Sequence, residues 1–157
     1  MKDPERSLAF YRDTLGMTLL SSKTLGEGTD WGFSLFFLGN PPPEGQEALS
    51  PGAAFQPCLE LTHNHGTETD ETFVHFNGNE DGRKGFGHIG YLVDDVYKAC
   101  EGFEEMGCDF VKRPDGGSMK GLAFVKDPDG YWIEVIKRGG EPGINAMAAT
   151  DTQLRGM

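Results

Sequence analysis

The sequence predicts an α+β fold of two similar modules, each a strand and a helix followed by three strands (βαβββ), with the opening strand missing from the first module. The 157-residue chain has single-domain length, and its 23 glycines indicate short strands joined by tight turns. A shift of 91 residues lays Asp3 on Asp94 and Gly16 on Gly107, which indicates an internal repeat. In that repeat, the counterpart of the strand at residues 85–93 would precede the start of the chain by three or four residues.

The first module is expected to begin with a helix. Asp3 suits the N-cap, Pro4 the first helical position and Glu5 the positive first turn, while Gly16 ends the helix. The apolar face consists of Leu8, Tyr11 and Leu15.

Three strands complete the first module, at residues 17–22, 31–38 and 58–62, with a polar turn at 26–30. The middle strand is rich in aromatic residues and presents either plain core or an apolar substrate wall. That face consists of Phe33, Leu35 and Phe37. Residues 39–57 contain much proline, glycine and glutamate without periodicity, which predicts an exposed loop.

The second module follows a polar insertion at residues 65–84. Its first strand, 85–93, has β-branched or aromatic residues at alternate positions and carries a single histidine, His88. A helix then begins at Asp94 or Asp95 and ends at Gly107. The apolar face of this helix consists of Val96, Ala99, Cys100, Phe103 and Met106. The remaining strands are expected at 109–112, 122–126 and 131–136, with turns at 114–117 and 127–130 and a flexible tail at 139–157.

Charge and composition exclude several classes of protein. The net charge of −11 disfavours unspecific binding to nucleic acid or to an anionic membrane. No apolar run approaches the roughly 20 residues of a spanning helix. The three cysteines, Cys58, Cys100 and Cys108, form no CxxC pair, and no secretory leader is present, so we expect a cytoplasmic protein with reduced thiols.

Three polar residues on strands suggest a metal site. Glu60 and Glu134 take equivalent places near the ends of the two halves, each among apolar neighbours, and His88 lies on the central strand of the second half. A carboxylate on an apolar face is costly unless it is paired or bound to a metal, although each residue alone could lie on a solvent-facing edge. Carboxylate and imidazole ligands without thiolate suit zinc, nickel, cobalt or manganese. The other histidines, His63, His65 and His75, are interpreted as surface or loop-ordering residues, and the facing of His63 stays open.

Several longer runs resemble one family closely. The most specific are LELTHN at 59–64, GFGHIG at 85–90, KGLAF at 120–124 and DPDGYWIE at 127–134. Over residues 2–138 the chain resembles the glyoxalase I (lactoylglutathione lyase) family of the vicinal-oxygen-chelate superfamily. The resemblance implies one domain over 1–138, with a first half-barrel module at 1–64, truncated at its start, and a second at 85–138.

The resemblance also implies a site. The metal ligands would be Glu60, His88 and Glu134, with a fourth ligand on the missing first strand. The insertion at 65–84 is similar to that of the long members of the family, which use zinc. The implied metal is therefore zinc, with nickel as the alternative. Glutathione would be the co-substrate. The implied substrate contacts are Asn64, Arg83, Lys84, Lys112, Gly117, Met119, Trp132, Phe33, Leu35 and Phe37.

The implied reaction is isomerisation of the methylglyoxal–glutathione hemithioacetal to S-lactoylglutathione, which detoxifies methylglyoxal. Glu134 would move the proton, Glu60 would act on the opposite stereoisomer, and the sites would lie at the interface of a homodimer. The alternative is a non-catalytic ligand-binding module of the same fold, inactive because the first-strand ligand is absent. A metal dioxygenase ranks last, because it normally uses two histidines and one carboxylate.

Overall fold

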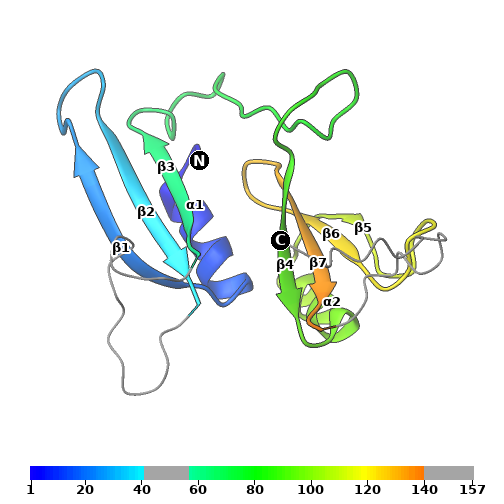
Figure 1. Cartoon of the computed structure of the whole chain (residues 1–157). Helices are drawn as coiled ribbons and strands as arrows, with labels where there is room; N and C mark the ends of the chain where they lie inside the picture. Colours follow the sequence, from blue (N-terminus) through cyan, green and yellow to red (C-terminus); the bar gives the residue numbers. More distant parts are fainter. Residues whose placement is uncertain (41–56, 140–157) are drawn as a thin grey trace, which may run out of the picture. The chain divides into compact units, whose positions relative to one another are not determined.

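The computed structural model describes residues 1–40 and 57–139, which form two compact units with a boundary between Phe76 and Asn77 (Figure 1). The predicted loop at 39–57 and tail at 139–157 lie almost wholly outside the described residues. The elements of the first unit are α1 (Pro4–Ala9), the π-helical turn η1 (Phe10–Thr14), β1 (Thr18–Leu25), β2 (Phe33–Gly39) and β3 (Leu59–Asn64). Those of the second are β4 (His88–Val93), α2 (Val96–Glu105), β5 (Phe110–Lys112), β6 (Ala123–Lys126) and β7 (Trp132–Lys137).

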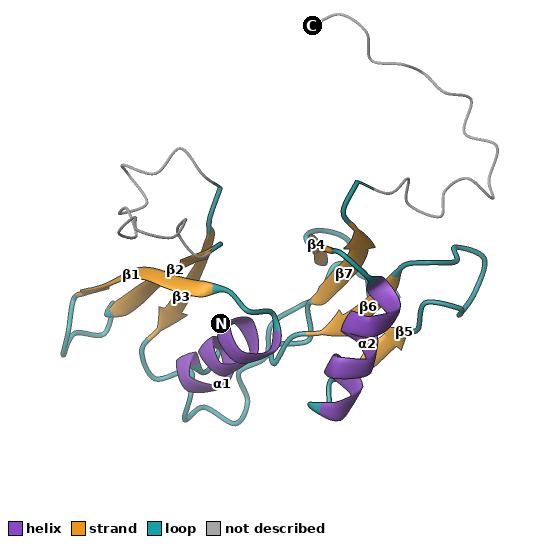
Figure 2. Ribbon diagram, turned by 90° about the horizontal axis from the view of Figure 1, so that it is seen from below, coloured by secondary structure: helices purple, strands orange, loops and turns teal. Residues whose placement is uncertain are grey.

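The first unit is a three-stranded antiparallel sheet in the order β1-β2-β3, with α1 along one face (Figures 1 and 2). The helix begins as the sequence predicts, because Asp3 Oδ1 accepts hydrogen bonds from the backbone nitrogens of Glu5 at 2.9 Å and Arg6 at 3.3 Å. The predicted apolar residues Tyr11 and Leu15 are buried. Leu8 is only half-buried.

The helix of the first unit contains one residue more than the repeat allows. The N-cap residues are Asp3 and Asp95, whereas the glycines that follow the helices are Gly16 and Gly107, both with positive φ. Asp95, not Asp94, is therefore the counterpart of Asp3. The extra residue is taken up by the π-helical turn, in which the Leu15 nitrogen donates to the Phe10 carbonyl at 3.2 Å.

The second unit is a four-stranded sheet in the order β4-β7-β6-β5, in which β4 runs parallel to β7 and the other pairs are antiparallel. α2 covers one face (Figure 2). The buried core comprises Ala123, Val125, Ile133 and Val135 of the sheet with Val96, Cys100 and Phe103 of α2. The expectation that Met106 joins this face is wrong: it is the C-cap, beyond the last helical turn, and its side chain is 51% exposed.

The strand order of the two halves confirms the predicted α+β fold. In the described residues, the first sheet has no counterpart of β4, as the repeat predicts. Strand limits differ from expectation mainly at the ends. β1 continues to Leu25 and β3 to Asn64. β4 starts only at His88. The first bond to β7 is made just before it, where the Gly87 carbonyl accepts from the Trp132 nitrogen. No helix in the described part of the chain is long and apolar enough to cross a membrane.

Candidate functional site

Each sheet has one face turned toward its helix and one open face, and the predicted site residues of β2, β3, β4 and β7 lie on the open faces. In the first unit, the register of β2 and β3 pairs Phe37 with Glu60 and Phe33 with Asn64. Leu35 lies between the two phenylalanines on the same face, because side chains alternate along a strand. All three apolar residues are half-buried, and Glu60 and Asn64 are exposed. The predicted sharing of one face by Phe33, Leu35 and Phe37 is confirmed, and this face also carries the glutamate.

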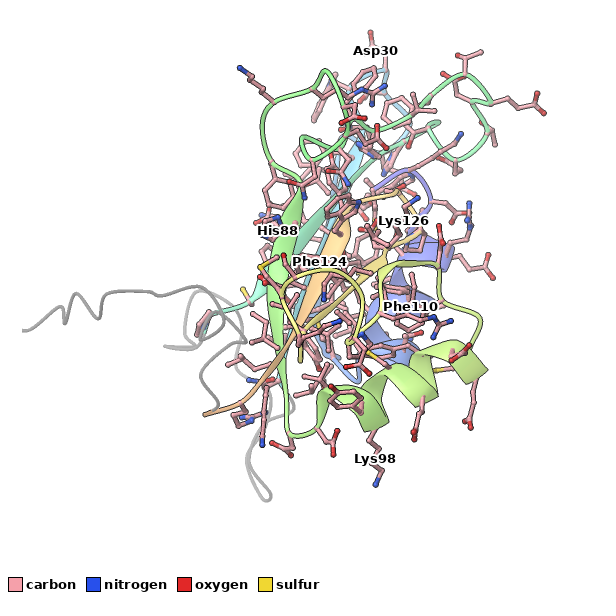
Figure 3. All side chains as sticks on the ribbon, turned by 90° about the vertical axis from the view of Figure 1, so that its right-hand side faces the viewer. Asp30, His88, Lys98, Phe110, Phe124 and Lys126 are labelled. Carbon is pink, nitrogen blue, oxygen red and sulfur yellow. The ribbon has the colours of Figure 1, made fainter. Side chains whose placement is uncertain are left out.

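In the second unit, the open face carries His88, Trp132 and Glu134. The parallel register sets His88 beside Trp132 and Gly90 beside Glu134, and the antiparallel register sets Phe124 on the other side of Glu134. The ring of Phe124 lies close to two other rings on this face, with 5.8 Å between the centroids of His88 and Phe124 and 5.6 Å between those of Phe124 and Trp132. Figure 3 labels His88 and Phe124. Phe124 therefore flanks Glu134 on one side, and on the other side Gly90 has no side chain, although a Cβ there would lie 3.5 Å from Cδ1 of Ile136.

The two glutamates occupy equivalent positions in their sheets. Each is flanked by a phenylalanine of the preceding strand, Phe37 beside Glu60 and Phe124 beside Glu134. They differ on the other flank, where Glu134 has β4 and Glu60 has no paired strand among the described residues. Glu134 is accordingly half-buried, while Glu60 is exposed.

A metal would find suitable donors in these residues. Two carboxylates and one imidazole, without a thiolate, match the oxygen and nitrogen ligands that divalent zinc and nickel accept. Within either unit, the described residues contain no group of three or more His, Cys, Asp or Glu side chains that could hold an ion. Glu60 belongs to the first unit, and His88 and Glu134 belong to the second.

Two of the expected substrate contacts lie in an exposed segment before β4. Arg83 forms an ion pair with Glu80 at 2.9 Å, and both side chains are largely exposed. Lys84, the next residue, is also exposed. Both cationic side chains therefore lie at the surface of the second unit, ahead of the strand that carries His88.

The remaining contacts cluster between β5 and β6. The Lys112 ammonium donates to the Leu122 carbonyl at 2.6 Å, and burial, followed by repulsion from Lys120, lowers the pKa of Lys112. A Cβ on Gly117 would lie 3.8 Å from Cε of Lys112, so these two predicted residues are neighbours. The loop is also bound at Asp115. The Tyr97 hydroxyl of α2 donates to the Asp115 carboxylate at 2.9 Å, and Lys120 donates to the Asp115 carbonyl. Met119 lies half-buried in this loop.

The other histidines have structural partners. His63 is only 6% exposed and faces away from Glu60, and its Nε2 lies 2.7 Å from Glu68 Oε2. The pKa of Glu68 is lowered first by a hydrogen bond from its own backbone amide, then by the one from His63 and, more weakly, by the one from the Gly66 amide. His65 Nε2 lies 2.9 Å from the Ser34 hydroxyl. These contacts agree with the interpretation of loop-ordering residues.

The sequence alone does not indicate a role for three residues near His88. Phe124 was assigned to a strand without a role, although its place opposite Glu134 follows once the register is known. Asn77 and Asn79 lie in the insertion that we expected to be only polar. A usable signal was present, since asparagine on both sides of Gly78 is typical of a turn that bonds to its own backbone.

Comparison with known proteins places these features in context. The family model described as the Glyoxalase/Bleomycin resistance protein/Dioxygenase superfamily matches residues 1–135. A lactoylglutathione lyase of Pseudomonas aeruginosa is 47% identical over 142 residues, which cover 87% of this chain and 77% of that protein. Glyoxalase I of Saccharomyces cerevisiae is 43% identical over 139 residues, covering 87% of this chain and 42% of the yeast protein.

Among solved structures, glyoxalase I from Zea mays is similar, with a TM-score of 0.63 and 29% identity. The match covers 90% of this chain and 43% of the maize chain. The described chain thus spans less than half the length of the yeast and maize proteins, but most of the length of the bacterial one.

Proposed function

The chain belongs to the lactoylglutathione lyase (glyoxalase I) family of the glyoxalase/bleomycin resistance protein/dioxygenase superfamily, and from this membership we propose that it isomerises the hemithioacetal of methylglyoxal and glutathione to S-lactoylglutathione. The observation that carries the proposal is the placement of His88 and Glu134 on one open sheet face, with Glu60 at the equivalent position of the other unit. We further propose that residues 1–138 act as one domain.

We propose Glu60, His88 and Glu134 as ligands of a zinc ion, with nickel as the alternative. A fourth ligand is expected on a first-unit counterpart of β4, a strand that the described residues do not include. When bound, the metal would act as a Lewis acid on two neighbouring oxygens of the substrate and acidify the hydrogen on the carbon between oxygen and sulfur. Because a homodimer could supply ligands from two copies, we expect dimerisation to accompany activity.

Glu134 is proposed as the base that takes this proton and returns it to the adjacent carbon, which converts the hemithioacetal to a thioester without net loss of atoms. Phe124 flanks this carboxylate on one side, and Gly90 places no side chain on the other. Glu60, beside Phe37, would serve the opposite stereoisomer.

The glutathione part of the substrate would be held by polar and cationic groups around these faces. We propose Asn64, Arg83, Lys84, Lys112 and Gly117 for this role, because each offers a hydrogen-bond donor to a carboxylate or peptide oxygen. The apolar part would contact Phe33, Leu35, Phe37, Met119 and Trp132. The site is thus apolar where the carbon chain lies and basic where carboxylates bind, despite the acidic chain as a whole.

The test measures bound metal and hemithioacetal isomerisation on the same preparations. We expect Glu134→Gln to retain metal and to lose about 100-fold or more of the activity, the usual contribution of a general base. Glu101→Gln, an exposed glutamate of α2 in the same unit, controls for the charge change and should be unaffected. Full activity in Glu134→Gln would refute the assignment.

A further inference from the structure

Two asparagines fix the segment that enters β4. The Asn77 side chain is 2% exposed; its Oδ1 accepts from the Asn79 backbone nitrogen at 2.8 Å, and its Nδ2 donates to the Gly130 carbonyl at 2.7 Å. The nitrogen of Gly78 donates to the Phe86 carbonyl at 2.8 Å. The backbone of Asn79 is therefore held from two sides and has little freedom to shift.

The side chain of Asn79 reaches across Gly87 to His88, with Asn79 Nδ2 3.1 Å from His88 Nδ1. A Cβ on Gly87 would lie 2.5 Å from Asn79 Cγ and 2.7 Å from Asn77 Oδ1, so only glycine leaves room for the amide. Gly87 cannot move away freely, because it is buried and its carbonyl accepts from the Trp132 nitrogen at 2.9 Å. The contact between Asn79 and His88 is thus built into the fold.

The partner of Nδ1 decides which nitrogen of a neutral imidazole carries the proton. An amide NH₂ group facing Nδ1 makes Nδ1 the acceptor and leaves the proton on Nε2, which then has no lone pair for a metal. A half-turn of the amide presents Oδ1 instead; Nδ1 then donates its proton, and Nε2 is free to coordinate. Histidines that bind metals normally donate their other ring N–H to an acceptor of this kind.

We propose that Asn79 is a positioning residue that selects the tautomer of His88, with its amide nitrogen toward Nδ1 in the metal-free chain and its oxygen toward Nδ1 when Nε2 binds a metal. The inference rests on the proposed function in that it takes His88 as a ligand. The insertion at 65–84 would thus orient a metal-binding histidine, a role that neither the polarity nor the length of the insertion indicates.

The experiment compares the whole chain with the Asn79→Asp and Asn79→Ala variants. Imidazole nitrogen shifts in NMR, assigned with His88→Gln, report the tautomer without and with Zn²⁺, and competition with a chelating dye reports Zn²⁺ affinity. Glu80→Ala, an exposed change in the same segment, is the matched control.

In the unaltered chain, we expect the proton on Nε2 without metal and on Nδ1 with Zn²⁺. The Asn79→Asp variant, whose carboxylate only accepts, should hold the proton on Nδ1 throughout and keep or raise Zn²⁺ affinity. Asn79→Ala should mix the tautomers and lower the affinity by about 10-fold or more, the usual effect of removing such a partner.

Two results separate this inference from the proposed function. If His88→Gln leaves Zn²⁺ affinity unchanged, His88 is not a ligand and both fail. If His88→Gln abolishes binding while Asn79→Ala keeps the original tautomer and affinity, or Asn79→Asp loses as much affinity as Asn79→Ala, the ligand assignment stands and the role of Asn79 is overturned.

Discussion

Replacing Asn77 by alanine should destabilise the second unit by about 2 to 4 kcal/mol. The side chain is buried and makes two hydrogen bonds, one to the Asn79 nitrogen and one to the Gly130 carbonyl. Each bond contributes about 1 kcal/mol net, and a buried partner left unsatisfied costs about 1 to 3 kcal/mol. The bond to the Gly130 carbonyl joins the segment before β4 to the turn before β7, and the bond from the Asn79 nitrogen fixes that segment internally, so the loss of both loosens this approach to the open face.

Urea unfolding measures this effect in one unit alone. Trp132 lies in the second unit, and Trp31, which is 62% exposed in the first, can be replaced by phenylalanine so that the fluorescence reports on Trp132. Asn77→Asp keeps the acceptor but puts a buried carboxylate against the Gly130 carbonyl oxygen, and should destabilise the unit at least as much as alanine does. An exposed change, Glu80→Ala, should stay within about 0.5 kcal/mol. A loss below about 1 kcal/mol for Asn77→Ala would show that water replaces both bonds and that the segment is not anchored as described.

Three further measurements test the N-cap of α2 and the burial of Cys100. Asp95→Ala removes the N-cap of α2, whose Oδ1 accepts from the Tyr97 and Lys98 nitrogens at 2.9 and 3.1 Å. The free energy of unfolding in urea should fall by about 1 kcal/mol. An unchanged unfolding midpoint would contradict the capping role of Asp95. Burial raises the pKa of the Cys100 thiol from 9.0 to about 11, so the folded protein should lose stability as the pH rises from 9 through 11. At pH 8, Cys100 should resist alkylation while the exposed Cys58 reacts, as peptide mass spectrometry can show; equal rates would refute the burial argument.

Local sequence signals predicted the fold because each element carries its own physical marks. The N-cap at Asp3 and the glycines that end both helices need no tertiary information, since the first satisfies free amides and the second allow positive φ. The π-helical turn was not predictable in the same way. One extra residue in a helix changes no composition or periodicity strongly, and its accommodation depends on what the helix packs against.

The site was predicted in its residue types but not in its surroundings. The internal repeat was enough to expect Glu60 and Glu134 at equivalent places, because each lies on the strand that ends its half of the chain. The facing of His63 required the true end of β3, since a strand that ended at Thr62 would leave it free. The support of His88 by Asn79 depends on a close crossing over Gly87, which is a contact between segments and leaves no periodic trace in the sequence.

The repeat also explains why the two glutamates should not be equivalent in function. Duplication gives each glutamate a phenylalanine neighbour from the preceding strand. Among the described residues, only Glu134 has a further strand on its other side, and that strand carries His88, which contacts Asn79, and Gly90, which has no side chain. A half-buried carboxylate held between two strands keeps one orientation at lower entropic cost than an exposed one. Glu134 is therefore the better ordered of the two carboxylates in the described part of the chain, which supports the proposal that Glu134 is the main base.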